Sequence, residues 1–240
     1  MTISQADWTA YITQLSRISG RAAKAMQDYM AASRNASLEQ LIRYAYTLTT
    51  RYGEAAAALA CEMYDAVAAA SGAAVPAAIP ADTAAAAEVS AAIRAVEGQA
   101  VSLVPSIAAR YVKRAAADTT LKNAVRDGAE WAWVPHGDTC PFCITLASRG
   151  WQPASHKALK GGHAEHIHSN CNCEYAIRFD GRTEIEGYDP EGYLQQYQDA
   201  DGHKWQDKVN AMRRERYAQD ADAINEQKRA AYAARKAREE

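Results

Sequence analysis

Residues 140–143 read Cys-Pro-Phe-Cys, and residues 168–173 read His-Ser-Asn-Cys-Asn-Cys. A Cys-x-x-Cys turn brings two thiolates close enough to share one tetrahedral Zn²⁺, and a second knuckle must then supply two more donors. The second stretch contains residue types that can do so. The two stretches therefore predict one zinc ion that holds the surrounding segment together.

Five candidate donors compete for the four places of such a site. We favour a set in which Cys140 and Cys143 are joined by His168 and by either Cys173 or Cys171. A set of four cysteines stays open as the alternative. Both sets are closed and leave no position for water, so they predict a structural role for the zinc and not a catalytic one.

Short strands are expected on both sides of the cysteines. Residues 131–134 (Trp-Ala-Trp-Val) alternate before Pro135, and residues 175–179 (Tyr-Ala-Ile-Arg-Phe) alternate before an Asp-Gly turn. Residues 189–191 (Asp-Pro-Glu) have the order of an N-cap followed by proline at the first helical position. Residues 128–200 are thus predicted to form a small zinc-stabilised α+β module.

The first 127 residues are predicted to form an α-helical domain, because apolar residues recur there at three- and four-residue steps. The first helix carries Trp8 and is expected to stop or kink at Gly20. The second begins at Ser37, which fits a capping box with Gln40. A separate third helix is expected around Met63.

Two prolines, Pro76 and Pro80, then interrupt the helical pattern. Asp82 or Thr83 is expected to cap a fourth helix that runs to Gly98. Another helical stretch follows and extends towards residue 125. The abundance of alanine predicts helices with thin, alanine-lined contacts.

Residues 201–240 are predicted to form a charged helical tail, since Lys, Arg, Asp and Glu are mixed there with alanine. The predicted fold class is therefore mainly α, with an N-terminal helical region, a small zinc-stabilised α+β module and a charged C-terminal helix. Zinc binding can supply on the order of 10 kcal/mol, so we expect the module to depend on the metal more than the helices do.

The composition excludes several classes of protein. The net charge of -2 gives no overall attraction to nucleic acid or to anionic membranes. An odd number of cysteines, four of them in two close pairs, is not typical of a secreted disulfide framework and indicates a reducing compartment. Neither a signal peptide nor an apolar run long enough to span a membrane is expected.

The segment between the two cysteine stretches also contains residues that fit two other functions. His163, Glu165 and His166 could form a catalytic metal site of nuclease type, although ordinary loop residues are the simpler interpretation. Their order relative to the cysteines does not fit the zinc deaminases. A third hypothesis is a nucleic-acid-binding zinc module that uses Arg149, Lys157 and Lys160, together with the basic residues of the tail. Cys61 lies in an alanine-rich helix and is expected to be a small buried residue.

The cysteine frame resembles a known family. The run from Asp138 to Cys143, the Leu-Ala-Ser-Arg-Gly of residues 146–150 and the spacing of His168, Cys171 and Cys173 are similar to the cysteine–histidine module of MuF-like minor capsid proteins. These proteins are also called phage head morphogenesis proteins, and those of tailed phages that infect actinobacteria are most similar. The resemblance covers residues 131–197 and includes the helix after the module.

The resemblance implies a structural, non-enzymatic protein of the phage head. It implies a low-copy internal component that associates with the portal or the major capsid protein, with contact to packaged DNA as a further expectation. The expected location is the virion, and the host cytoplasm during assembly. No membrane and no small-molecule substrate are expected as partners.

Overall fold

The structure is a computed structural model that describes residues 2–98, 101–137, 139–155 and 173–239; for residues 231 and 233–239 it describes the backbone only. The chain forms two compact units. The first compact unit comprises Met1–Thr139 and Arg149–Tyr188, and the second comprises Cys140–Ser148 and Asp189–Glu240. The domains predicted from the sequence, 1–127, 128–200 and 201–240, stay a prediction, because compactness does not measure which segments fold independently.

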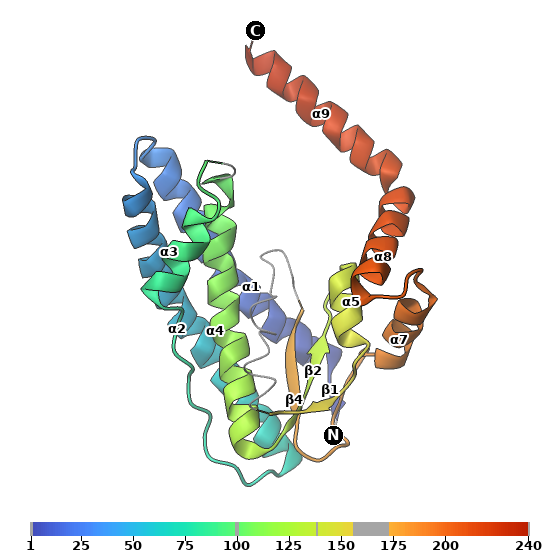
Figure 1. Cartoon of the computed structure of the whole chain (residues 1–240). Helices are drawn as coiled ribbons and strands as arrows, with labels where there is room; N and C mark the ends of the chain where they lie inside the picture. Colours follow the sequence, from blue (N-terminus) through green and yellow to red (C-terminus); the bar gives the residue numbers. More distant parts are fainter. Residues whose placement is uncertain (1, 99–100, 138, 156–172, 240) are drawn as a thin grey trace. The chain divides into compact units, whose positions relative to one another are not determined.

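Long helices dominate the first compact unit (Figure 1), so the predicted mainly α class is confirmed. Its helices are α1 (Gln5–Ala32), α2 (Leu38–Ser71), α3 (Ala86–Arg94) and α4 (Val104–Asp127), with a short 3-10 helix, η1 (Val101–Leu103), before α4. The predicted capping box is present at the start of α2. The Ser37 hydroxyl accepts the N–H of Gln40 at 3.3 Å, and the Gln40 side chain accepts the N–H of Ser37 at 2.8 Å.

The expected stop at Gly20 is wrong, since α1 continues to Ala32. No atom lies within 4 Å of the position where a Cβ on Gly20 would stand. A glycine inside a helix costs only about 1 kcal/mol. The burial of Ala22 and Met26 in the next turns offsets this cost.

The second and third predicted helices are one continuous helix, α2. Gly53 lies inside α2, so its role is not to form a turn. A Cβ on Gly53 would stand 2.9 Å from the Thr83 methyl group and 3.5 Å from the Ala115 Cβ. The glycine therefore allows other parts of the chain to approach α2 closely.

The predicted cap of α3 is also wrong. The helix begins after Ala85, not after Asp82 or Thr83, and the N–H of Ala85 is accepted by the Glu88 carboxylate at 3.0 Å. Glu88 also pairs with Arg114 of α4 at 3.0 Å. The contact between α3 and α4 thus fixes the start of α3, which local sequence signals place at Asp82 or Thr83.

The helices pack through small side chains, as predicted. The most extensive contact is between α2 and α4. Both helices bury several alanines, among them Ala56 and Ala60 on α2 and Ala108 and Ala116 on α4. Larger residues form a core cluster around α1, α2, α3 and α4: Met26, Leu41, Ile42, Ala45, Leu48, Val89, Ile93, Val104 and Tyr111.

Residues 73–85, which we call the strap, connect α2 to α3 in extended form (Figure 1). Side chains of the helices hold its backbone. Asn123 of α4 donates to the carbonyl of Ile79 at 2.8 Å and accepts the N–H of Ile79 at 2.9 Å. Asp65 of α2 accepts the N–H of Ala78 at 2.8 Å. The strap is therefore held by hydrogen bonds between its backbone and side chains of α2 and α4.

The end of α4 completes the attachment of the strap. Arg126 donates to the carbonyls of Pro76 and Ala77 at 2.9 and 3.1 Å, and it forms two 2.7 Å hydrogen bonds with Asp127. These bonds from Arg126 hold the pKa of Asp127 below its usual value. Asp127 also accepts the hydroxyl of Tyr64 from α2 at 2.7 Å, which ties the two helices together.

A three-stranded antiparallel sheet belongs to the same unit. Its strands are β2 (Glu130–Val134), β3 (Gln152–Pro153) and β4 (Glu174–Arg178), in the order β3-β2-β4. Glu130 is opposite Arg178 and Val134 is opposite Glu174. The two strands predicted from the alternating patterns are thereby confirmed.

The sheet packs on the helices through β4. Tyr175 makes edge contacts with Trp131 and Trp133 of β2, with ring centroids 5.0 and 4.8 Å apart. Ile177 is buried, and the ring of Phe179 lies edge-on to Tyr64 of α2 at 5.5 Å. This apolar support for the strands comes from distant parts of the chain, so the sequence did not show it.

The start of the chain is held in the first compact unit by a small parallel pair. Strand β1 (Thr2–Ile3) pairs with β5 (Glu184–Ile185), and the Glu186 carboxylate accepts the N–H of Gln5 at 2.9 Å. Ile3 and Ile185 are both buried. The segment after β4 therefore anchors the beginning of α1.

The second compact unit is helical. Its helices are α5 (Pro141–Ala147), α7 (Pro190–Asp199), α8 (Trp205–Gln219) and α9 (Ala221–Glu239). The predicted cap of α7 is confirmed, because the Asp189 carboxylate accepts the N–H of Gly192 at 2.9 Å. Within the part of the chain that the structure describes, no helix combines the length and apolar character needed to cross a membrane.

Replacing Asn123 with Ala is expected to lower the free energy of unfolding by about 2 kcal/mol, because both backbone groups of Ile79 lose their partner. Urea unfolding followed by circular dichroism measures the change. Lys122→Ala, at the exposed neighbouring position, is the matched control and should change stability by less than about 0.5 kcal/mol. Equal effects of the two substitutions would show that the strap is not held by Asn123.

Replacing Ile177 with Ala is expected to cost about 3 kcal/mol, since it removes buried methyl groups where β4 meets the helices. Tryptophan fluorescence, to which Trp131 and Trp133 of β2 contribute along with Trp8, Trp151 and Trp205, and the helical circular dichroism signal should then shift to lower denaturant together. Arg182→Ala is a control at an exposed position. A fluorescence transition that came well before the loss of helix would contradict a shared core.

Candidate metal centre

The first predicted zinc knuckle has a defined local structure in the second compact unit. Cys140 is the N-cap of α5, and its sulfur accepts the N–H of Cys143 at 3.5 Å. Pro141 occupies the first helical position, where its missing N–H costs nothing. Cys140 and Cys143 are three residues apart, so the two side chains lie along the same side of the first turn.

The hydrogen bond to the Cys140 sulfur bears on metal binding. Zinc binds the thiolate form of cysteine, and a hydrogen bond to the charged form favours that form. Cys143 is almost fully buried, and Cys140 is partly exposed. Neither forms a disulfide bond. The local geometry of this pair therefore fits the donor chemistry of half a zinc site.

The other predicted ligands are only partly described. Cys173 is buried directly before β4, in the first compact unit, and it forms no disulfide bond. His168 and Cys171 lie outside the described residues. Among the residues that the structure describes, no three His, Cys, Asp or Glu side chains form a group that could hold a metal. The complete ligand set stays a prediction from the sequence.

Most residues of the nuclease hypothesis and of the nucleic-acid hypothesis also lie outside the described part of the chain. The three residues of the nuclease-type site and two cations of the nucleic-acid module lie outside the described residues: His163, Glu165, His166, Lys157 and Lys160. Arg149 is described and is exposed just after α5. Cys61, expected to be buried, is partly exposed on α2.

Aromatic and basic side chains surround α5 in its own unit. The rings of Phe142 and Trp205 lie 6.5 Å apart and connect α5 to α8. Lys208 of α8 donates to the carbonyls of Gln198 and Ala200 at 2.9 and 2.6 Å, which fixes the end of α7. The cysteine turn is therefore supported by helices that come much later in the sequence.

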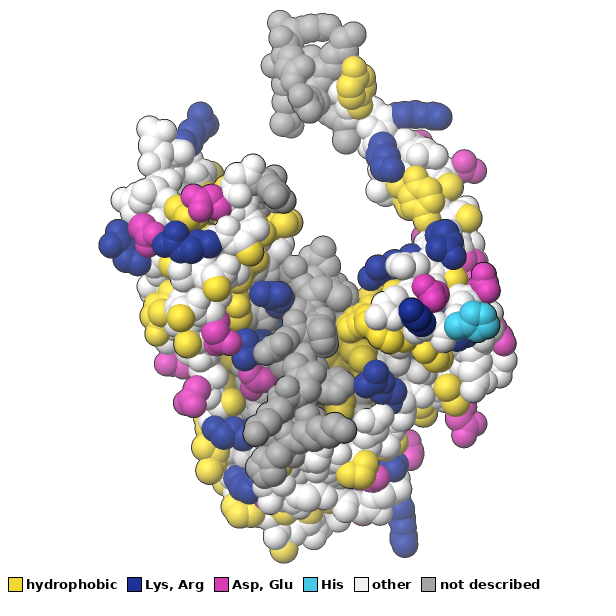
Figure 2. Space-filling view, in the orientation of Figure 1, with side chains coloured by type: hydrophobic (Ala, Val, Ile, Leu, Met, Phe, Trp, Pro, Cys, Tyr) yellow, Lys and Arg dark blue, Asp and Glu magenta, His cyan; other side chains and the backbone are white. Residues whose placement is uncertain are grey.

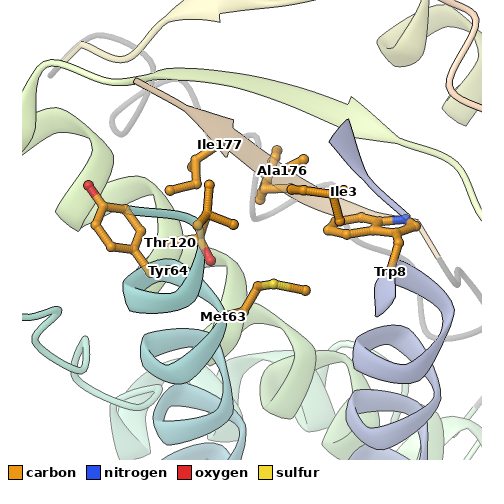
Figure 3. A pocket seen from close by; sticks show the side chains of 9 residues that line it. Ile3, Trp8, Met63, Tyr64, Thr120, Ala176 and Ile177 are labelled. Atoms are coloured by element: carbon orange, nitrogen blue, oxygen red, sulfur yellow. The ribbon is translucent and has the colours of Figure 1, made fainter. Parts of the chain in front are cut away.

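The first compact unit contains a small apolar pocket (Figure 3). Its volume of about 10 Å³ corresponds to a single water molecule and gives no room for an organic substrate. No local pattern in the sequence predicts this pocket, because its lining comes from five separate elements: β1, α1, α2, α4 and β4. The lining residues are Ile3, Trp8, Met63, Tyr64, Val67, Thr120, Tyr175, Ala176 and Ile177.

The model of a family described as VG15 protein matches residues 2–200, which is well over half of the chain. The chain belongs to the VG15 family. This is a family of phage gene products, so the protein is encoded by a phage.

The VG15 match includes both cysteine stretches and extends to the end of α7, whereas α8 and α9 lie outside it. It confirms the broader part of the resemblance described above, a phage protein. The narrower assignment to MuF-like minor capsid proteins is not part of this finding. No curated protein and no solved structure matches the chain.

Proposed function

We propose that this VG15 protein is a structural minor capsid protein of a tailed phage, which acts in head morphogenesis at the portal or the inner capsid. The observation that carries the proposal is the family match over residues 2–200, because it makes the protein a phage product and includes the cysteine frame. That frame is the part that resembles MuF-like head proteins. The partners we propose are the portal protein and the major capsid protein, with contact to packaged DNA.

The architecture of the first compact unit supports a structural role. Helix α2 has 34 residues, which corresponds to a length of about 51 Å. It is packed against α1 and α4 and is bridged by the strap. Such a bundle can act as a rigid spacer in an assembly without any catalytic group.

A structural zinc ion is part of the proposal. We propose ligands from Cys140, Cys143, His168, Cys171 and Cys173, four of which complete a closed tetrahedral site. The N–H···S hydrogen bond from Cys143 to Cys140 supports the first pair. When bound, zinc would supply a cross-link between segments that are distant in sequence.

Purified wild-type protein is expected to contain one zinc ion per chain by elemental analysis. Cys140→Ser should lose most of it, whereas Cys61→Ser, at a cysteine far outside the motif, should keep it. Substituting Ala for His163, Glu165 or His166 should leave the zinc content unchanged, because a four-coordinate site does not need them.

Two outcomes would contradict this assignment. Zinc-free wild-type protein would remove the metal from the proposal, and loss of zinc in His166→Ala would mean that His168 is the wrong histidine. A second metal ion per chain, lost when His163 or Glu165 is replaced, would favour the nuclease hypothesis instead.

The proposed role in the head is tested in the phage that encodes the protein. Mass spectrometry of purified virions should find the protein in the head fraction, and a nonsense mutation in its gene should lower the yield of infectious particles. A plasmid copy of the wild-type gene should restore that yield. Normal heads and normal infectivity without the protein would overturn the capsid role but leave the zinc result untouched.

A further inference from the structure

Helix α9 has little packing of its own. None of its residues with a described side chain is buried, and of the described elements only α8 packs on it to any extent. Tyr232 is 71 % exposed, and Tyr217, at the end of α8, is 48 % exposed. In Figure 2, hydrophobic side chains stand among charged ones along these two helices.

This lack of packing matters because most helices in proteins are stabilised by a buried apolar face and not by propensity alone. Side-chain pairs along α9 add little. Asp222 and Glu226 are one turn apart and have the same sign, which is unfavourable. A helix of this kind gains stability when another surface covers it.

The charges of α9 change sign along the helix. Its first part, residues 221–227, contains two acids, Asp222 and Glu226, and no base, and Asp220 precedes it as the C-cap of α8, where it pairs with Arg216 at 3.9 Å. Residues 228–238 contain five bases and no acid before Glu239: Lys228, Arg229, Arg235, Lys236 and Arg238. The acidic block covers about two helical turns of α9 and the basic block about three.

We propose that α9 pairs in antiparallel orientation with α9 of a second copy of this chain. An antiparallel copy places the acidic block of each helix beside the basic block of the other. A register that opposes the two blocks brings Glu226 level with Arg229 of the second copy and places Asp222 within one turn of its Arg235. A parallel copy would place like charges side by side, which costs free energy at every pair.

The same charge order argues against a nucleic acid as the occupant. A phosphate backbone attracts the basic block but is repelled by the three acids directly before it. A second copy of the chain satisfies both blocks at once. The pairing uses residues outside the VG15 match and does not rest on the proposed capsid function.

Sedimentation of the full-length protein between about 1 and 100 µM tests the pairing. A monomer–dimer equilibrium is expected that weakens between about 50 and 500 mM salt. The helical circular dichroism signal should fall on dilution, because unpaired α9 loses helix. A wild-type protein that stays monomeric over this range, or that dimerises with no effect of salt, would overturn the proposal.

Charge reversal identifies the helix responsible. Asp222→Lys with Glu226→Lys, and separately Arg229→Glu with Arg235→Glu, should each raise the dissociation constant at least about ten-fold. Mixing the two variants should restore the dimer, since one helix is then mainly basic, and the other has acids at positions 222, 226, 229 and 235 and keeps three bases. Glu54→Lys with Glu62→Lys, at exposed positions of α2, changes the net charge equally and is the matched control. The assignment would be contradicted if the control variant dimerised as weakly as the charge-reversed variants, or if mixing those two variants did not restore the dimer.

Zero-length cross-linking between carboxylates and lysines tests the orientation. In a mixture of isotopically light and heavy protein, the expected intermolecular product joins Asp220 or Asp222 to Lys236. Asp222 and Lys236 are about 21 Å apart along α9, so a link between these two positions can form only between copies. Monomers that bind duplex DNA through Arg229 and Lys236 would show that the occupant is a nucleic acid and that the proposal is wrong.

Discussion

The close contact between α2 and α4 is the constraint on which the first compact unit depends. Alanines on both helices and Gly53 on α2 let the backbones approach, and a Cβ on Gly53 would stand only 2.9 Å from the Thr83 methyl group and 3.5 Å from the Ala115 Cβ. Small residues bury little apolar area each, so the pair gains its stability from many close contacts. The strap, the start of α3 and the sheet all attach to surfaces that exist only when these two helices are in contact.

The sheet is an example of this dependence. Tyr175 and Ile177 of β4 lie against the same small pocket as Met63 of α2 and Thr120 of α4. The strands therefore have an apolar support that is independent of any metal. The proposed zinc ion would add to this support, and we therefore expect the sheet to depend on the metal less than the cysteine spacing alone suggests.

Local signals in the sequence predicted local structure well. The Ser37–Gln40 capping box, the Asp189–Pro190 helix start and the two alternating strands follow from interactions within a few residues, and all are present. Gly20 misled the prediction because a single exposed glycine costs less than the apolar face on either side of it supplies.

Structure that depends on distant residues could not be predicted in the same way. Asn123 hydrogen-bonds to both backbone groups of Ile79, which lies 44 positions before it in the sequence. The alanine- and proline-rich sequence of the strap does not indicate such a partner. Of the candidate metal centre, the predicted turn at Cys140 is present, and the ligand set stays a prediction. The sequence could not choose four donors among five, because that choice depends on how residues 144–167 place the second knuckle.

The two proposals concern different parts of the chain and can fail separately. The capsid role rests on residues 2–200, where the family match and the cysteine frame lie, whereas the pairing rests on the charge order of residues 217–238. A salt-sensitive contact through α9 would be weak in a dilute cytoplasm and stronger where copies are concentrated, since dimer formation depends on protein concentration. Under the proposed capsid role, copies gathered at one site of an assembling particle would therefore favour the paired form of α9.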